Sequence, residues 1–98
     1  MRFTEIQVPD LLKIGLEPGA KIYKAGKLQV IVGQQPNDGR WHLSISHPGR
    51  YPTWDEIKEA RYQLVPNNVT MAMLLPPKEQ YVNVHANCFH LWEIREDF

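Results

Sequence analysis

The chain has a single cysteine, Cys88, so no disulfide can form within it. A chain without disulfides is typical of a reducing compartment. It also lacks any apolar run approaching the roughly 20 residues of a membrane-spanning helix. Its first residues, MRFTEIQVPD, have neither the apolar core nor the small-residue cleavage site of a secretory signal. These absences predict a cytoplasmic protein without a membrane partner.

Neither sign of charge is in excess, because eleven Lys and Arg residues balance eleven Asp and Glu residues. A neutral chain lacks the broad positive field that holds nucleic acid non-specifically, which argues against a nucleic-acid partner. The motifs G-x-S-x-G, G-x-x-x-x-G-K-[ST] and H-E-x-x-H are also absent. The sequence therefore predicts no catalytic residue and no cofactor, although it does not decide whether the protein is an enzyme.

The remaining composition is that of one small folded domain, which we place at residues 1–98. Hydrophobic residues make up 43% of the chain, which is enough for a compact core. Eight prolines and six glycines divide the chain into short segments. Frequent prolines and glycines favour strands and turns over long helices.

Alternating segments predict most of the strands. Residues 41–46 alternate without a break, so that His42, Ser44 and Ser46 share one side and the apolar residues share the other. This pattern is typical of a half-buried antiparallel strand. A turn rich in Pro, Asn, Asp and Gly joins it to a β-branched strand at residues 28–33. Further strands are predicted at residues 2–8, 20–24, 69–75, 81–85 and 89–94, with a short helical turn at 9–16.

Residues 53–64 form the one predicted α-helix. Thr53 is a suitable N-cap, and Glu56 three residues later completes a capping box. Trp54 and Ile57 begin the apolar face that we expect to be buried against the sheet. A proline shortly after the segment ends the helix.

The order of these elements predicts an α+β fold, a small antiparallel sheet with one main α-helix packed on one face. Helices and strands do not alternate regularly, which argues against a parallel doubly wound sheet. A chain this small can leave a sheet edge uncovered, so a homodimer is a further hypothesis. The segment 89–94 is the edge we expect to pair in it.

Cys88 lies in the pattern His85-x-x-Cys88-x-His90, whose side chains are of kinds that bind transition metals. The spacing matches none of the usual structural zinc patterns. Along a strand, His85 and His90 would also point to opposite faces. The sequence therefore predicts no metal site.

A second hypothesis concerns phosphate. His42 and Ser44 share one side of their strand, and the H-x-S triplet they form resembles half of the signature of the two-histidine phosphoesterases. No second triplet occurs in the chain. His47 and Arg50 follow in the loop that leads to the helix, where they supply positive charge. The hypothesis is an enzyme or ligand-binding protein for a phosphate-containing compound, using His42, Ser44, His47 and Arg50, with His85 as a further member of the ligand site.

Four motifs together resemble a group of small, uncharacterised proteins encoded by bacteriophages and prophages. They are R-Y-P-T-W-D-E-I from residue 50, M-L-L-P-P from residue 73, Y-V-N-V-H from residue 81 and C-F-H-L-W from residue 88. The resemblance covers about residues 41–94. It implies an accessory protein in the cytoplasm of a bacterial host, and it assigns no catalytic residue.

The leading functional hypothesis is a non-catalytic protein-binding module that acts on a host or phage protein. Aromatic residues and Arg are the usual anchors of protein interfaces. The contact residues we predict are Arg50, Tyr51, His90 and Trp92.

Overall fold

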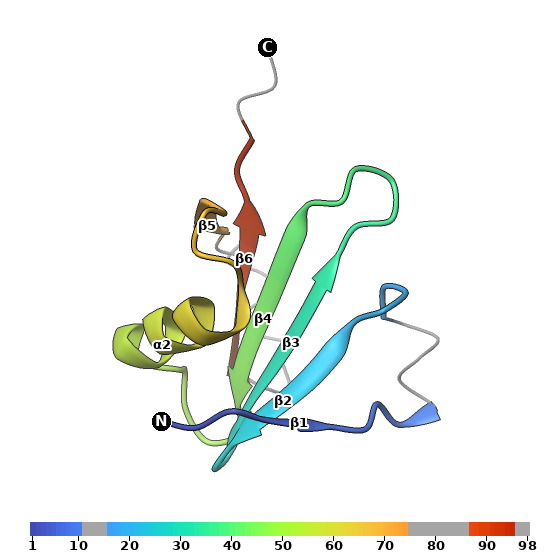
Figure 1. The fold of residues 1–98 in the computed structure, drawn as a ribbon. Coiled ribbons are helices and arrows are strands. Elements are labelled where there is room, and N and C mark those ends of the chain that lie inside the picture. The colour runs from blue at the N-terminus through green and yellow to red at the C-terminus, as the bar shows by residue number, and fades with distance from the viewer. Residues whose placement is uncertain (11–15, 75–86, 96–98) are drawn as a thin grey trace.

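The computed structural model describes residues 1–10, 16–74 and 87–95, and within these ranges the protein has the predicted α+β fold (Figure 1). Along the chain, the described elements are four strands, a helix and two strands. They are β1 (Thr4–Ile6), β2 (Lys21–Ala25), β3 (Leu28–Gln34), β4 (Trp41–His47), α2 (Trp54–Leu64), β5 (Met71–Leu74) and β6 (Asn87–Glu93). The predicted strand at 81–85 and most of the helical turn at 9–16 lie outside the described residues.

All strand pairs of the sheet are antiparallel, in the order β1-β2-β3-β4-β6-β5. The chain crosses over once, because β6 inserts between β4 and β5. The prediction that residues 89–94 form a free edge is therefore wrong, since both sides of β6 are occupied by neighbouring strands. Among the described strands, the edges are β1 and β5.

Helix α2 begins where its capping residues predict. The Thr53 side chain accepts a hydrogen bond from the Glu56 amide, and the Glu56 side chain accepts one from the Thr53 amide. This reciprocal pair satisfies two of the backbone donors that a helix start leaves free. The helix ends at Leu64, followed by an extended Val65 and the proline that prevents continuation.

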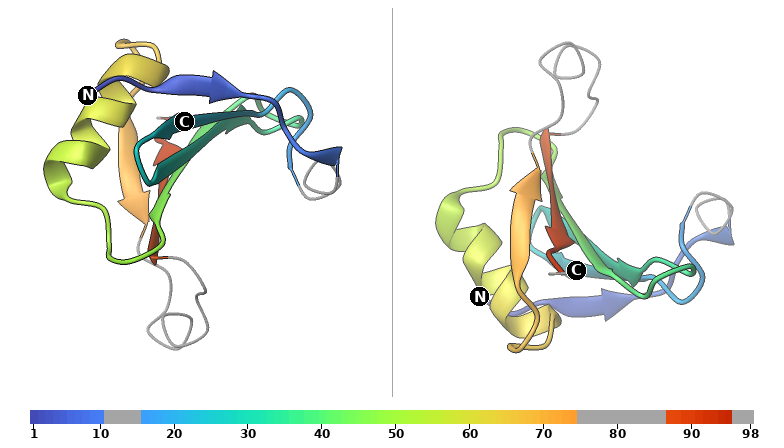
Figure 2. Two further views of the ribbon diagram at one scale, coloured as in Figure 1. Left: turned by 90° about the horizontal axis from the view of Figure 1, so that it is seen from below. Right: turned by 90° about the horizontal axis from the view of Figure 1, so that it is seen from above.

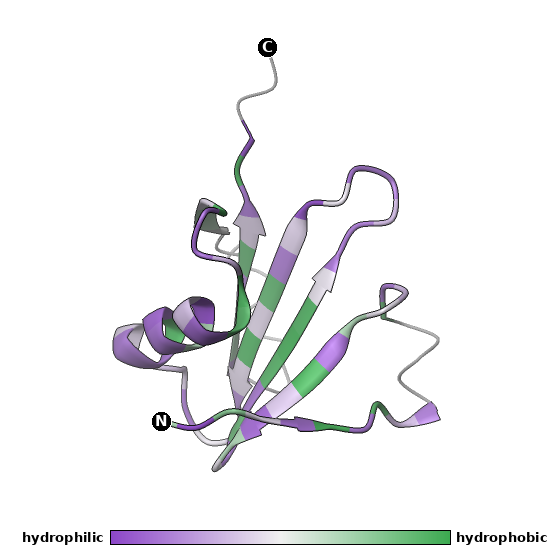
Figure 3. Cartoon of the chain, in the orientation of Figure 1, coloured by the Kyte–Doolittle hydropathy of each residue, from purple (hydrophilic) through white to green (hydrophobic). Residues whose placement is uncertain are grey.

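The core lies between α2 and one face of the sheet. Figure 3 shows apolar and polar bands alternating along β4, as expected for a strand with only one side buried. The end-on views of Figure 2 show the sheet curving, with β5 at one edge and the start of β1 at the other both near α2. The buried core residues are Leu28, Val30, Val32, Leu43, Ile45, Ile57, Ala60, Val65 and Leu91.

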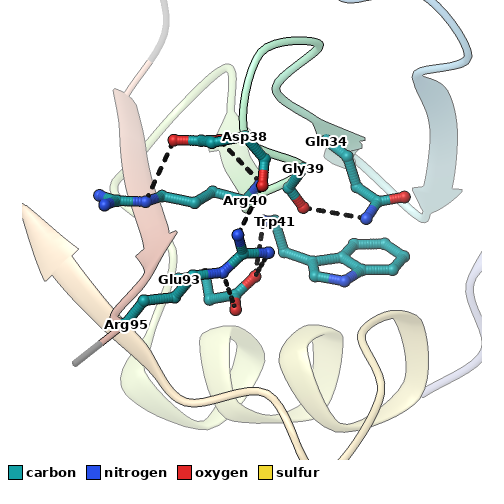
Figure 4. A network of polar contacts seen from close by, with 7 residues as sticks. All are labelled: Gln34, Asp38, Gly39, Arg40, Trp41, Glu93 and Arg95. Atoms are coloured by element: carbon teal, nitrogen blue, oxygen red, sulfur yellow. Dashed lines mark hydrogen bonds and ion pairs between the residues drawn. The ribbon is translucent and has the colours of Figure 1, made fainter. Parts of the chain in front are cut away.

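A polar network holds the end of β6 against the start of β4 (Figure 4). The Trp41 amide donates to Glu93 Oε1 at 3.1 Å, and Arg95 Nε donates to Glu93 Oε2 at 2.8 Å. Arg95 also donates to the carbonyl oxygen of Asp38 in the β3–β4 loop. The hydrogen bond from Arg95 lowers the pKa of Glu93, so its carboxylate stays ionised and keeps both contacts. The network therefore links the end of β6 to the start of β4 and to the β3–β4 loop. No helix within the described ranges is long and apolar enough to cross a membrane.

Candidate functional site

The side of the sheet away from α2 carries a row of polar side chains from the two neighbouring strands β4 and β6. Leu43, Ile45 and Leu91 face the core, so the residues between them point to the opposite side. Across the ladder, His42 is paired with Trp92, Ser44 with His90 and Ser46 with Cys88. We call these six residues the polar face: His42, Ser44, Ser46, Cys88, His90 and Trp92.

Four of these side chains contact one another in a continuous chain. His42 Nε2 lies 3.1 Å from His90 Nδ1, which is a hydrogen bond between two imidazoles. The other ring nitrogen of His90, Nε2, lies 3.6 Å from Cys88 Sγ. Cys88 Sγ in turn lies 3.1 Å from Ser44 Oγ. The polar face therefore joins two imidazoles, a thiol and a hydroxyl.

Glu17 extends this chain from outside the two strands. Its Oε1 lies 3.9 Å from His42 Nδ1, the ring nitrogen that His90 does not use. Gly33 of β3, the partner of His42 across the ladder, leaves the space for this carboxylate. A Cβ at Gly33 would lie 2.5 Å from Glu17 Oε2, so the Glu17 carboxylate would have to shift away. Glycine at position 33 thus permits Glu17 to approach His42.

Trp92 packs flat on His42 at the other end of the polar face. The ring centroids are 4.0 Å apart and the planes are inclined by 12°. An aromatic ring on one face of an imidazole limits access of water to it and fixes the plane of the ring. The His42 side chain is only 18% exposed as a result of these contacts.

Burial sets the protonation of the polar face. Burial, and then the neighbouring His90, lower the pKa of His42 from 6.5 to about 4. Burial likewise lowers the pKa of His90 and raises that of the Cys88 thiol, although the hydrogen bond with Ser44 opposes the second effect. Burial also raises the pKa of Glu17. Near neutral pH both imidazoles and the thiol are uncharged, an arrangement that can relay a proton and does not attract an anion.

The residues of the phosphate hypothesis are only partly brought together. His42 and Ser44 share the polar face, as their alternation predicts. His47 lies at the end of β4, where its Nδ1 accepts a hydrogen bond from the Gly49 amide. Arg50 makes two hydrogen bonds, at 2.7 and 2.9 Å, with the Glu56 carboxylate of the capping box. His85 lies outside the described residues.

Cys88 and His90 carry side chains of kinds that bind transition metals. Among the residues that the structure describes, no group of three or more His, Cys, Asp or Glu side chains is placed to hold a metal ion. His90 directs its two ring nitrogens toward different partners, Cys88 and His42.

The four predicted contact residues lie on two different surfaces. Arg50 and Tyr51 are near the start of α2, where Tyr51 is 39% exposed and packs on Phe89 with ring centroids 5.2 Å apart. His90 and Trp92 belong to the polar face, on the other side of the sheet from α2. A single interface therefore cannot use all four residues at once without wrapping around the sheet.

Helix α2 presents an exposed aromatic stripe that was not predicted from the sequence. Trp54 is 58% exposed and Tyr62 is 67% exposed, with Lys58 between them and its Nζ 6.0 Å from the Trp54 ring. The prediction that Trp54 is buried is wrong. Trp54 lies at the margin of the apolar stripe, ~60° around the axis from Ile57, and in the first turn. Residues 54, 58 and 62 follow the four-residue spacing of one helix face, so the sequence groups them together but does not indicate whether that face is exposed. We call Trp54, Lys58 and Tyr62 the outer stripe.

Comparisons with known proteins give one family and no named relative. Comparison with curated proteins and with solved structures found no match. A family model matches residues 32–96, a range that contains α2 and every residue of the polar face but not Glu17. The matched residues make up about two thirds of the chain. The chain therefore belongs to the family described as domain of unknown function DUF7694.

Proposed function

We propose that the chain is a phage-type accessory protein that binds a host or phage protein through the outer stripe of α2. The observation that carries the proposal is the exposure of two large aromatic side chains, Trp54 and Tyr62, on one face of one helix. Trp and Tyr are the residues that most often dominate the energy of protein interfaces. The resemblance of the motifs to small phage and prophage proteins supports the accessory role and the bacterial host cytoplasm.

The helix is held rigidly enough to act as a binding element. Its first turn is closed by the capping box, and Arg50 adds two hydrogen bonds to the same Glu56 carboxylate. Its inner face is anchored in the core by Ile57 and Ala60. A preorganised helix loses little conformational entropy on binding, so its exposed aromatics can contribute fully to affinity.

The spacing of the outer stripe indicates the kind of partner. Anchors separated by four residues along a helix are those of helix-in-groove recognition, in which an apolar groove of the partner receives one helix face. Lys58 lies between the two aromatics and Asp55 and Glu59 beside them, so the rim of such a groove carries charges of both signs. Beside the stripe is a shallow hollow lined by Asp55, Lys58, Glu59, Arg61, Tyr62 and Asn67.

Affinity capture from lysate of phage-infected bacteria tests this proposal. The full chain is immobilised, and retained proteins are identified by mass spectrometry and then purified for a binary binding assay. The doubly substituted Trp54→Ala/Tyr62→Ala chain should lose the retained partner. Ile94→Ala is the matched control, because Ile94 is a large apolar residue that is 50% exposed but lies off the helix.

The binary assay decides the outcome. Loss of at least about a hundredfold in affinity for the double variant, with the Ile94→Ala chain unchanged, is expected for two interface anchors. Equal affinity of the double variant and the native chain would refute the assignment of the outer stripe. Light scattering of the native chain alone distinguishes a foreign partner from a second copy of the chain.

A further inference from the structure

The polar face has a property that partner binding through α2 does not use. Its side chains form one continuous series of contacts. The series begins at the Glu17 carboxylate, passes through His42 and His90, and ends at the Cys88 thiol and the Ser44 hydroxyl. A nucleophile beside an imidazole that is itself oriented by a further group is the general arrangement of an activated nucleophile. Cys88 as a residue is partly exposed.

The position of Glu17 favours one set of proton positions along this chain. An ionised carboxylate 3.9 Å from His42 Nδ1 favours the tautomer with the proton on that nitrogen. His42 Nε2 then accepts from His90 Nδ1, which leaves His90 Nε2 without a proton and facing Cys88 Sγ at 3.6 Å. The nitrogen nearest the thiol is therefore a base.

We propose that Cys88 is a nucleophile that accepts an acyl group from a thioester, with His90 as its general base and with His42 and Glu17 as positioning residues. Ser44 is the further element that indicates acyl chemistry. Its hydroxyl lies 3.1 Å from the sulfur, so it is close to where the carbonyl oxygen of a bound thioester acquires negative charge. A donor at that place stabilises the tetrahedral intermediate.

The transfer step is balanced without any oxidant or cofactor. The Cys88 thiol gives its proton to His90 Nε2 while its sulfur forms a bond to the carbonyl carbon. The tetrahedral intermediate collapses with cleavage of the carbon–sulfur bond of the donor. The departing thiolate takes the electron pair and then the proton from His90. The products are acylated Cys88 and the free donor thiol.

A general base is required because Cys88 is a protonated thiol at rest. Burial raises the pKa of the thiol, so a standing thiolate does not supply the reactivity. Burial lowers the pKa of His90, which keeps its ring neutral and able to accept a proton at physiological pH. The outer stripe lies on the other side of the sheet, so this inference does not depend on the binding function.

The first test is the pH dependence of Cys88 alkylation by iodoacetamide, followed by intact mass. If His90 removes the proton during attack, the rate is nearly constant between about pH 7 and about pH 8, because His90 is already neutral there. The alkylation rate of an unassisted thiol with a raised pKa increases about tenfold over the same pH unit. A tenfold rise in the native chain would overturn the proposal.

Variants separate the base from the positioning residues. His90→Gln should lower the rate at pH 7 by roughly a hundredfold and restore the steep pH dependence. Glu17→Gln should act in the same direction but by less. Gly33→Ala should imitate it, because the added methyl group displaces the Glu17 carboxylate without changing its chemistry. Unchanged rates and unchanged pH profiles in all three would contradict the assigned roles.

Ser46→Ala is the matched control. Ser46 is paired with Cys88 across the ladder, yet its hydroxyl contacts the Gln29 carbonyl oxygen and not the sulfur. Its alkylation profile should equal that of the native chain. Thermal melts of every variant verify folding. If His90→Gln does not fold, the pH profiles of Glu17→Gln and Gly33→Ala still test whether the polar face assists the reaction of Cys88.

The second test examines the acyl class with the acetyl thioester of a small thiol as the probe. The native chain should gain one acetyl group, and the Cys88→Ser chain should gain none. The rate of acetylation should be at least tenfold lower in His90→Gln and in Ser44→Ala. Assisted alkylation without acetyl transfer would refute the thioester donor. Equal transfer in the native and Ser44→Ala chains would refute the role of the hydroxyl.

Discussion

The two sides of strand β4 come from alternate residues of one short segment, yet they hold different kinds of interaction. Toward α2, Leu43 and Ile45 are 0% exposed and belong to the apolar core. On the other side, His42 and Ser44 are partly exposed and each contacts a titratable side chain of β6. Apolar burial stabilises the fold without directional requirements, whereas the polar contacts depend on protonation. The comparison predicts that stability resides on one side and chemistry on the other.

The largest difference between the two sides should appear on truncation of adjacent residues. Ile45→Ala is expected to lower the free energy of unfolding by about 2–5 kcal/mol, because it opens a cavity in a fully buried site. Ser46→Ala next to it should cost less than about 1 kcal/mol, since its hydroxyl makes one long hydrogen bond of 3.5 Å. Urea melts measure both. Similar losses for the two variants would break the comparison.

Acid should weaken the fold through the polar face. His42 titrates at about 4 in the folded chain and near 6.5 when unfolded, so the unfolded state binds more protons between these values. Stability is therefore lost as the pH falls from about 6.5 toward about 4, by about 3 kcal/mol in total for this group. His90, whose pKa is also lowered, acts in the same direction, and Glu17, whose pKa is raised, opposes it.

His42→Gln isolates this contribution. The difference in unfolding free energy between the native chain and the variant, measured by urea melts at each pH, should shrink or reverse on acidification. The Glu56 carboxylate, with its pKa lowered to about 2, also loses stability in acid, but it does so in both chains and cancels from the difference. A difference that stays constant from neutral pH to about pH 4 would show that His42 does not titrate as its burial requires.

The start of α2 lies on the core side of the sheet. Thr53→Ala removes the hydroxyl that accepts from the Glu56 amide and should cost about 1 kcal/mol. Because the helix covers only the core face, this loss should be the same at neutral and mildly acidic pH and should leave Cys88 alkylation unchanged. A Thr53→Ala chain with altered alkylation would indicate that the two sides of the sheet are coupled.

The fold was predictable because its signals are local. The capping box of Thr53 and Glu56 and the unbroken alternation of residues 41–46 each determine an element within a few residues of sequence. The order of strands in the sheet was not predictable in the same way. The insertion of β6 between β4 and β5 depends on pairing between segments far apart in the chain, and no short pattern records it.

The candidate site was half predictable for the same reason. The common side of His42 and Ser44 follows from alternation along one strand, and so does that of Cys88 and His90. That the two strands are neighbours, and that Glu17 reaches His42 over Gly33, depends on pairing and on a loop. The same limit explains the misplacement of Trp54, because its position on α2 is compatible with either burial or exposure until the sheet is placed.

The smallest effect on stability is expected for Trp54→Ala, which tests the outer stripe against both sides of the sheet. Trp54 is 58% exposed, with Lys58 Nζ 6.0 Å from its ring centroid, so its removal should change the unfolding free energy by less than about 0.5 kcal/mol. Ile57→Ala, three residues on and 3% exposed, should cost about 2–5 kcal/mol. Urea melts of the two variants compare the two faces of one helix under identical conditions. A loss for Trp54→Ala as large as that for Ile57→Ala would mean that the indole packs against the protein and is not available to a partner. A small loss of unfolding free energy, with unchanged alkylation of Cys88, would show that the isolated fold does not need the exposed indole. The outer stripe would then remain free to bind a partner.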